Sequence, residues 1–205
     1  MTTAAAMVHV IDDDDAVRSA LRLLFKSVSL PVHSWASAKE FLPQYRADSP
    51  GCIVADVRMP GMSGLELQQA LNLQGAITPI IFITGHGDVA MAVEAMRFGA
   101  FDFLTKPFRD QDLIDRVQRA IEKDAGNRRT IVRTQDVRLR LQSLTPRERE
   151  VFELVTRGLA NKVMAGDLGV SQRTVEIHRA RVMEKMRAES LAQLVRMSLQ
   201  LAEPE

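Results

Sequence analysis

Cysteine, tryptophan and tyrosine each occur only once among the 205 residues. Because a single thiol, Cys52, cannot form an internal disulfide, nothing in the chain requires an oxidising compartment. No apolar run approaches the roughly 18 residues of a membrane span, and aspartates from Asp12 onward interrupt the N-terminal stretch before it could act as a signal sequence. We therefore expect a soluble, cytoplasmic protein with no membrane partner.

Net charge is also nearly absent, at +1, but the two ends of the chain differ. Residues 1–124 contain 12 Lys and Arg against 16 Asp and Glu, whereas residues 125–205 contain 15 against 10. The length and the 46% hydrophobic content are sufficient for two domains with separate cores. An acidic front and a basic back predict two domains with different partners.

Short apolar segments alternate with segments of helical period through the front part. The predicted strands are residues 7–11, 32–35, 52–56, 79–84 and 100–105. A helix is predicted after each strand, over 14–28, from a cap at Ser37, and over 64–74, 88–98 and 110–124. Five such alternations predict an α/β domain whose parallel sheet has right-handed crossovers and helices on both faces.

Chemically active side chains stand at the ends of these strands. Asp12 and Asp13 follow the first strand, Asp56 ends the third, Thr84 ends the fourth and Lys106 follows the fifth. Because the carboxyl ends of parallel strands share one edge of a sheet, we expect these residues to lie together. Clustered carboxylates need a cation, and oxygen ligands with room for water and phosphate suit Mg²⁺. The set predicts phosphoryl transfer to Asp56, although each residue alone also fits an ordinary loop or surface position.

Four motifs at these positions resemble the receiver domain of two-component response regulators, over roughly residues 7–122. They are Val10-Ile-Asp-Asp13, Asp56-Val-Arg-Met-Pro60, Ile83-Thr-Gly-His-Gly87 and Asp102-Phe-Leu-Thr-Lys-Pro-Phe108. The resemblance implies a flavodoxin-like five-stranded parallel sheet of order 2-1-3-4-5. It also implies that a sensor histidine kinase phosphorylates Asp56, and that the chain is a phosphoacceptor rather than an enzyme, with at most slow self-dephosphorylation.

The same resemblance implies a role for each residue of the site. The Mg²⁺ ligands would be Asp12, Asp13, Asp56 and the backbone carbonyl of Arg58. Thr84 would be the switching hydroxyl, Lys106 the phosphate-pairing lysine and Phe103 the aromatic that changes rotamer. The Lys106-Pro107 peptide bond would be cis.

Residues 123–139 are predicted to form a linker that is only partly helical. Ala125-Gly126-Asn127 breaks the helical period, and few large apolar residues follow before a helix resumes near Thr134. The arginines of this segment either contact DNA phosphates or belong to a solvated hinge, and the composition favours the hinge.

Residues 140–202, in the basic part of the chain, contain sequence patterns typical of helix starts and ends. Thr145 and Glu148 form a capping box at the start of one helix. A short helix from Asn161 and a longer one after it are joined by a three-residue turn that begins with Gly169. This arrangement predicts an all-α helix-turn-helix unit, and a plain helical bundle with a charged exterior is the alternative.

This part resembles the C-terminal DNA-binding domain of the LuxR, NarL and FixJ group, and FixJ-type members are the closer match. The motifs are Leu144-Thr-Pro-Arg-Glu-Arg-Glu150, Gly158-Leu-Ala-Asn-Lys162, Thr174-Val-Glu-Ile-His178 and Lys185-Met186. The resemblance implies a helix-turn-helix at 161–180 and a final helix, at 189–201, that pairs two copies. Because Glu176 and Ala180 stand where nitrate-type members carry base-contacting lysines, base contacts cannot be transferred from those members.

DNA binding and dimerisation are therefore assigned to residues of two predicted helices. The DNA-binding residues would include Gln172, Arg173, Thr174, Glu176, Ile177, Arg179 and Arg181. The dimerisation residues would be Leu191, Leu194 and Val195.

Together the two resemblances predict a phosphorylation switch. Phosphorylated Asp56 would promote a homodimer that binds double-stranded promoter DNA and regulates transcription. Activation is commoner in the FixJ-type group, with RNA polymerase as a further partner. Two other classes stay open. A Mg²⁺-dependent phosphohydrolase would want a second Asp two residues after Asp56, where Arg58 stands, and a small-molecule-sensing regulator would not need the strand-end residues.

Overall fold

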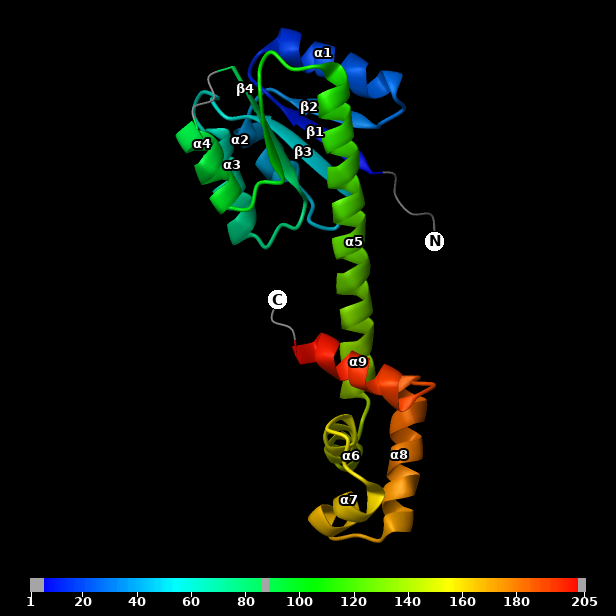
Figure 1. Cartoon of the computed structure of the whole chain (residues 1–205). Helices are drawn as coiled ribbons and strands as arrows, with labels where there is room; N and C mark the ends of the chain where they lie inside the picture. Colours follow the sequence, from blue (N-terminus) through cyan, green and yellow to red (C-terminus); the bar gives the residue numbers. More distant parts are fainter. Residues whose placement is uncertain (1–5, 86–88, 203–205) are drawn as a thin grey trace. The chain divides into compact units, whose positions relative to one another are not determined.

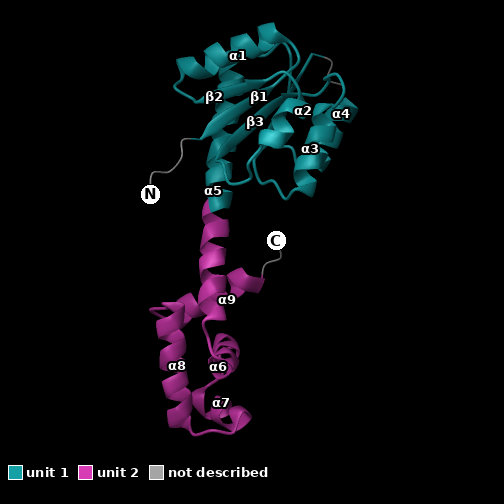
Figure 2. Ribbon diagram, turned by 180° about the vertical axis from the view of Figure 1, so that it is seen from behind, with its two compact units in different colours: residues 1–128 teal, residues 129–205 magenta. Residues whose placement is uncertain are grey.

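The computed structural model describes residues 6–85 and 89–202. The chain divides into two compact units, Met1–Arg128 and Arg129–Glu205 (Figure 2). None of the helices in the described ranges is both long and apolar enough to cross a lipid bilayer.

Within the described residues of unit 1, five parallel strands form one sheet in the order β2-β1-β3-β4-β5. The strands are β1 (Met7–Ile11), β2 (Val32–Trp35), β3 (Gly51–Asp56), β4 (Ile80–Thr84) and β5 (Asp102–Thr105). Every residue of β3 and β4 is buried, which explains their unbroken apolar sequence, because helices cover a parallel sheet on both faces. The order confirms the predicted flavodoxin-like fold.

Helices cover both faces of this sheet (Figure 1). They are α1 (Asp15–Ser27), α2 (Ala38–Phe41), α3 (Gly64–Leu73), α4 (Val89–Arg97) and α5 (Asp110–Gln142), with a 3₁₀ turn at Leu42–Gln44. One core places Phe41 and Leu67 of α2 and α3 against Ile53 of β3, and the other places Phe25 and Leu113 of α1 and α5 on the opposite face. The first residue of the predicted 88–98 helix lies outside the described residues.

The predicted break in the last of these helices is wrong. α5 continues without interruption through Gly126 to Gln142, so the helix does not end near residue 124 and resume near 134. A glycine inside a helix costs only about 1 kcal/mol relative to alanine. Contacts on either side of Gly126 can offset that cost, and Asp124 and Arg128 supply them.

Asp124 and Arg128 form a buried network at the start of β3. The Asp124 carboxylate accepts a hydrogen bond from the Gly51 backbone N–H at 3.0 Å and pairs with Arg128 Nε at 2.7 Å. Arg128 also donates to the Ala47 and Ser49 carbonyls, each at 2.7 Å. On both sides of Gly126, these bonds hold α5 to the segment before β3. They are tertiary contacts, and the helical period of the sequence does not predict them.

Unit 2 contains α6 (Pro146–Thr156), α7 (Asn161–Leu168), α8 (Gln172–Met186) and α9 (Leu191–Ala202) around a separate core. The Thr145 and Glu148 capping box is present, as predicted. Gly169 has a φ of 64° at the end of α7, and the Ser171 hydroxyl accepts the Thr174 N–H at the start of α8. These caps confirm the predicted helix-turn-helix.

Candidate functional site

Three strand ends of unit 1 meet at one ammonium group. Lys106 Nζ lies 2.9 Å from Asp12 Oδ2 and 3.2 Å from Asp56 Oδ1. Thr84 is almost fully buried at the end of β4, between β3 and β5, and its carbonyl accepts the Lys106 backbone N–H at 2.8 Å. The parallel order thus brings together four of the residues that the strand ends suggested, and the Lys106-Pro107 bond is cis, as expected.

The loop after β3 holds the Asp56 carboxylate in place. The Arg58 N–H donates to Asp56 Oδ2 at 2.7 Å. Gly64 begins α3 so close to this loop that a Cβ there would collide with the Asp56 carbonyl and the Phe82 ring. Only glycine therefore allows α3 to start here, with its Ser63 cap bonded to Glu66.

Lys106 offsets only part of the negative charge of the site, because one ammonium group faces the two carboxylates of Asp12 and Asp56. Burial raises the pKa of Asp56, while the hydrogen bond from Arg58 N–H and the charge of Lys106 act in the opposite direction. Burial alone would lower the pKa of Lys106, but the hydrogen bond and charge of Asp12, together with those of Asp56, outweigh it and the pKa is raised. Two carboxylates buried this closely need a cation, and Lys106 provides it here.

The predicted trio of clustered acids is not seen. Asp12 is buried and its Oδ1 accepts the Asp14 N–H at 2.9 Å, but Asp13 is exposed. In the described part of the chain, no three acidic, histidine or cysteine side chains are grouped closely enough to hold a metal ion. The convergent donors are therefore Asp12 and Asp56, and two carboxylates with backbone oxygens and water are a ligand set that suits Mg²⁺.

Phe103 lies half-buried in β5 and packs at the edge of the core that contains Phe82. Its backbone N–H donates to Asp102 Oδ1 at 2.8 Å. The His86-Gly87 end of the third motif lies outside the described residues.

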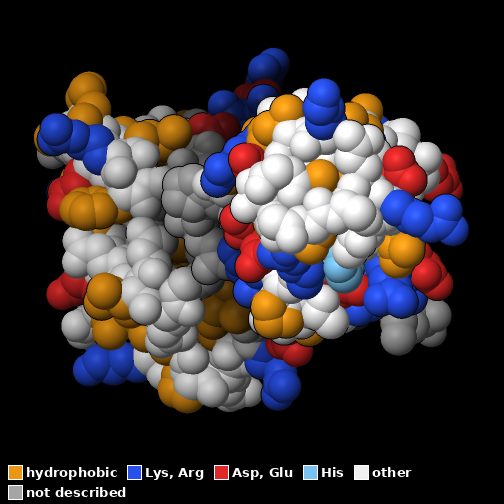
Figure 3. Space-filling view, turned by 90° about the horizontal axis from the view of Figure 1, so that it is seen from below, with side chains coloured by type: hydrophobic (Ala, Val, Ile, Leu, Met, Phe, Trp, Pro, Cys, Tyr) orange, Lys and Arg blue, Asp and Glu red, His pale blue; other side chains and the backbone are white. Residues whose placement is uncertain are grey.

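The predicted DNA-binding side chains are mostly exposed along α8. Gln172, Arg173, Glu176 and Arg181 are exposed, as is Ile177 at 48%. Figure 3 looks at the molecule from below, where Lys and Arg side chains, together with Asp and Glu side chains, surround a largely uncharged area. Along α8, the exposed cations of Arg173 and Arg181 thus accompany the exposed uncharged side chains of Gln172 and Ile177.

Three side chains of α8, those of Arg179, Thr174 and Lys185, already have partners within unit 2. Arg179 Nη1 donates to Asn161 Oδ1 at 2.9 Å, which links α8 to the start of α7. The Thr174 and Ser171 hydroxyls lie 2.8 Å apart. Lys185 Nζ pairs with the buried Glu148 at 2.6 Å, so this lysine stabilises α6 against α8.

The predicted dimerisation residues divide between the surface and the core. Leu191 is 39% exposed and Val195 is half-buried, but Leu194 is fully buried in the core of unit 2. Leu194 cannot therefore lie on a surface that meets a second copy in this conformation. Leu199, 62% exposed, lies on the same face of α9 as Leu191 and Val195, at a spacing of four residues.

Comparison with known proteins matches both units. A family model described as the response regulator receiver domain matches residues 8–118, and one described as bacterial regulatory proteins of the luxR family matches 142–198. The chain is 52% identical to the transcriptional regulatory protein FixJ of Azorhizobium caulinodans, over 94% of this chain and 91% of that protein. It is 41% identical to the response regulator protein TodT of Pseudomonas putida, over 98% of this chain and 88% of that protein.

Solved structures agree with these matches. The response regulator StyR has a TM-score of 0.86 at 42% identity, covering 96% of this chain and 100% of that chain. Full-length FixJ from B. japonicum has a TM-score of 0.60 at 42% identity, covering 99% of this chain and 100% of that chain. With its parallel sheet, its helix-turn-helix and this identity over nearly its whole length, the chain belongs to the FixJ-type response regulators, transcription regulators that join a receiver to a LuxR-type DNA-binding domain.

Proposed function

We propose that phosphorylation of Asp56 by a sensor histidine kinase controls how tightly this chain binds promoter DNA. The proposal assigns the receiver to residues 7–122, a connecting segment to 123–139 and the DNA-binding domain to 140–202. The observation that carries it is the meeting of Asp12, Asp56 and Lys106 at the carboxyl edge of the sheet. Because its target is promoter DNA, we also propose that the protein works in the cytoplasm.

Asp56 is the proposed nucleophile. One of its carboxylate oxygens attacks the phosphorus of a phosphohistidine, the P–N bond breaks, and the imidazole leaves with the electrons of that bond. Lys106, already 3.2 Å from Asp56, balances part of the charge of the phosphoryl group, and the Thr84 hydroxyl donates to one of its oxygens. The Arg58 N–H keeps the second carboxylate oxygen in a fixed orientation.

Asp12, Asp13, Asp56 and the Arg58 carbonyl are the proposed ligands of a Mg²⁺ ion. When bound, Mg²⁺ supplies positive charge to the phosphate oxygens. Asp13, exposed in this structure, would turn toward Asp12 to contribute.

The proposed switch carries the signal from Thr84 to the surface of α4 and β5. Thr84 moves toward the phosphoryl group, and Phe103 follows into the space that it leaves. α4 and the residue after it expose Val89, Val93, Met96 and Phe98, an apolar surface that a second copy can cover. Changing the population from mostly inactive to mostly active requires the phosphate to favour the active state by about 5.5 kcal/mol.

The proposed dimer places two α8 helices about one turn of DNA apart. Gln172, Arg173 and Glu176 near the start of α8 are the proposed base contacts, and Arg181 is a proposed phosphate contact. Leu191, Val195 and Leu199 of α9 are proposed to pair the two DNA-binding domains. Activation through RNA polymerase is the proposed outcome, since activation is commoner in the FixJ-type group.

Asp56→Asn tests the proposal, because the amide keeps the size of the side chain but is not a nucleophile. Incubation with acetyl phosphate and Mg²⁺ should add one phosphoryl group to the native chain and none to the variant, measured by intact-protein mass spectrometry. Asp48→Asn, at an exposed acid outside the site, should be labelled as the native chain is. Unchanged labelling of Asp56→Asn would refute the assignment.

A further inference from the structure

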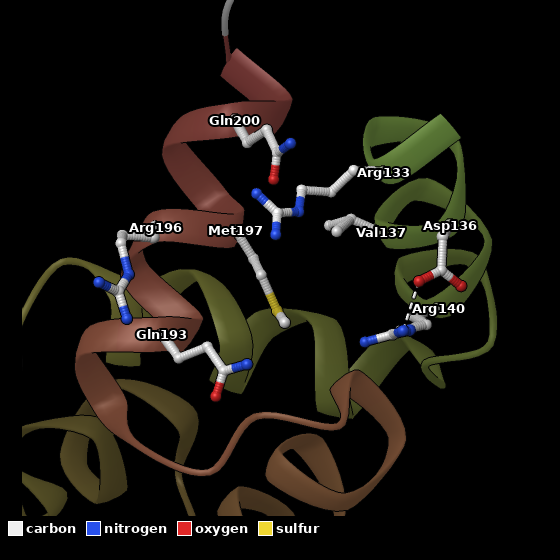
Figure 4. Close-up of a pocket in the computed structure, with 8 residues that line it drawn as sticks. All are labelled: Arg133, Asp136, Val137, Arg140, Gln193, Arg196, Met197 and Gln200. Atoms are coloured by element: carbon white, nitrogen blue, oxygen red, sulfur yellow. Dashed lines mark hydrogen bonds and ion pairs between the residues drawn. The ribbon is translucent and has the colours of Figure 1, made fainter. Parts of the chain in front are cut away.

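A polar cavity lies within unit 2, between the last turns of α5 and the helix α9 (Figure 4). Its volume is about 480 Å³. Val137, 3% exposed, and Met197, 9% exposed, form an apolar part of its wall, while the remaining lining side chains are charged or carry amides. The lining is therefore mainly polar, and its small apolar part suits a ligand that carries both a charged group and an apolar body.

Two guanidinium groups of this cavity have no acidic partner in the part of the chain that the structure describes. Arg140 pairs with Asp136 and donates to the Met186 carbonyl at 3.0 Å, so the one acid that lines the cavity is already neutralised. Among the described residues, neither Arg133 nor Arg196 forms an ion pair. The cavity therefore keeps an excess of two positive charges.

Two carboxamides add further donors. Gln193 Oε1 accepts the Glu189 N–H at 2.8 Å, which orients this side chain and leaves its NH₂ group to donate into the cavity. Figure 4 shows the Arg133 side chain reaching from α5 toward Gln200 and Met197 on α9. Guanidinium and amide groups thus approach the apolar wall from both helices.

We propose that this cavity binds a small organic phosphate, with the phosphate held by Arg133 and Arg196 and its apolar body against Met197 and Val137. Two guanidinium groups match the charge of a phosphate monoester dianion, and each can donate two parallel hydrogen bonds. The NH₂ of Gln193 provides a donor for a remaining oxygen. A volume of about 480 Å³ admits a ligand up to about the size of a mononucleotide.

DNA is a poorer fit for this cavity. Within unit 2, α9 lies beside the end of α8, whereas α7 lies beside its start (Figures 1 and 2). A duplex bound at the start of α8 would therefore lie at the opposite end of that helix from Arg133 and Arg196.

Adenosine 5′-monophosphate, inorganic phosphate and neutral adenosine are suitable probes for the full-length, unphosphorylated chain without Mg²⁺. Titration is followed through the ¹³C-methyl NMR signal of Met197. Adenosine monophosphate should shift this signal in a saturable way, and phosphate alone should shift it more weakly. Adenosine should bind at least tenfold more weakly than its monophosphate, because it lacks the charge that the arginines recognise.

Arg133→Gln/Arg196→Gln is the test variant, since both side chains are without described ion pairs and their replacement spares the core. It should bind adenosine monophosphate at least tenfold more weakly while keeping the native circular dichroism spectrum. Arg173→Gln/Arg181→Gln removes two exposed arginines of α8 and should bind as the native chain does. The proposal is overturned if the Met197 signal stays unshifted at millimolar nucleotide, or if the α8 variant loses binding while the cavity variant keeps it.

Discussion

Both units contain a nearly buried carboxylate paired with a lysine that is distant in the sequence. In unit 1 Lys106 pairs with Asp12 and Asp56, and in unit 2 Lys185 pairs with Glu148 at 2.6 Å. In each pair the acid is at most 10% exposed while the lysine keeps between 25% and 35% of its side chain in water. Removing one partner would leave the buried acid without compensation, which costs more than the pair contributes.

Glu148→Gln should destabilise unit 2 at neutral pH. The hydrogen bond from Lys185, followed by that from the Thr145 N–H, lowers the pKa of Glu148 below its ordinary value of 4.5. The folded state therefore favours the charged form. The resulting stability is complete above pH 4.5 and is lost as the pH falls through the lower folded pKa.

Hydrogen exchange of the α6 and α8 amides in the full-length chain measures this effect. At pH 7 the opening free energy should fall by about 2 kcal/mol in Glu148→Gln, and the difference from the native chain should shrink under acid conditions. Glu150→Gln, which removes a half-exposed acid beside Arg147, should change it by less than about 0.5 kcal/mol. Equal effects of the two substitutions would contradict the role of burial.

Among the elements, α5 differs most from its sequence pattern. Local signals predicted the capped start of α6 and the glycine turn at the end of α7, because such signals involve residues within one turn of the helix end. Nothing local reports that Arg128 reaches the carbonyls of Ala47 and Ser49, about 80 residues earlier. The same limit applies to Leu194, since apolar character alone does not distinguish a buried position on α9 from an exposed one.

Arg128→Ala should loosen α5 around Gly126. The substitution removes two bonds to backbone carbonyls and leaves Asp124, 1% exposed, without its cation. Loss of one member of a buried pair costs about 3 kcal/mol, so exchange of the amides near Gly126 should quicken roughly a hundredfold. Arg119→Ala, at an exposed position of the same helix, is the matched control and should leave these rates unchanged.

At the scale of the whole molecule, the charge division of the sequence corresponds to the two units. The acidic front contains the site at Asp56, and the basic back contains α8, with boundaries that differ by only a few residues from the structural division after Arg128. The proposed function requires the acidic unit to control the affinity of the basic one. A test of regulation must therefore measure how phosphorylation of unit 1 changes the DNA affinity of unit 2.

Binding of the native chain to its promoter should depend steeply on salt and on phosphorylation. Each phosphate contact lowers the logarithm of the association constant by about 0.9 per tenfold increase in salt. Acetyl phosphate with Mg²⁺ should tighten binding and increase dimer mass in light scattering for the native chain, with neither change in Asp56→Asn. A salt-independent affinity would argue against DNA binding by unit 2. If Asp56→Asn responded to acetyl phosphate as the native chain does, DNA binding would not depend on phosphorylation of Asp56.

The sequence by itself determined the strand and helix order, the residues at the strand ends and the helix-turn-helix, because each depends on periodicity, caps or motifs within short segments. Only the tertiary structure decided that Lys106 stands between Asp12 and Asp56, that Asp13 stays exposed, and that α5 continues through Gly126. It also decided that Leu194 is core and that α5 and α9 enclose a cationic cavity. These features depend on contacts between residues far apart in the chain. Such contacts produce no periodicity, cap or motif within a short segment, so the sequence alone does not predict them.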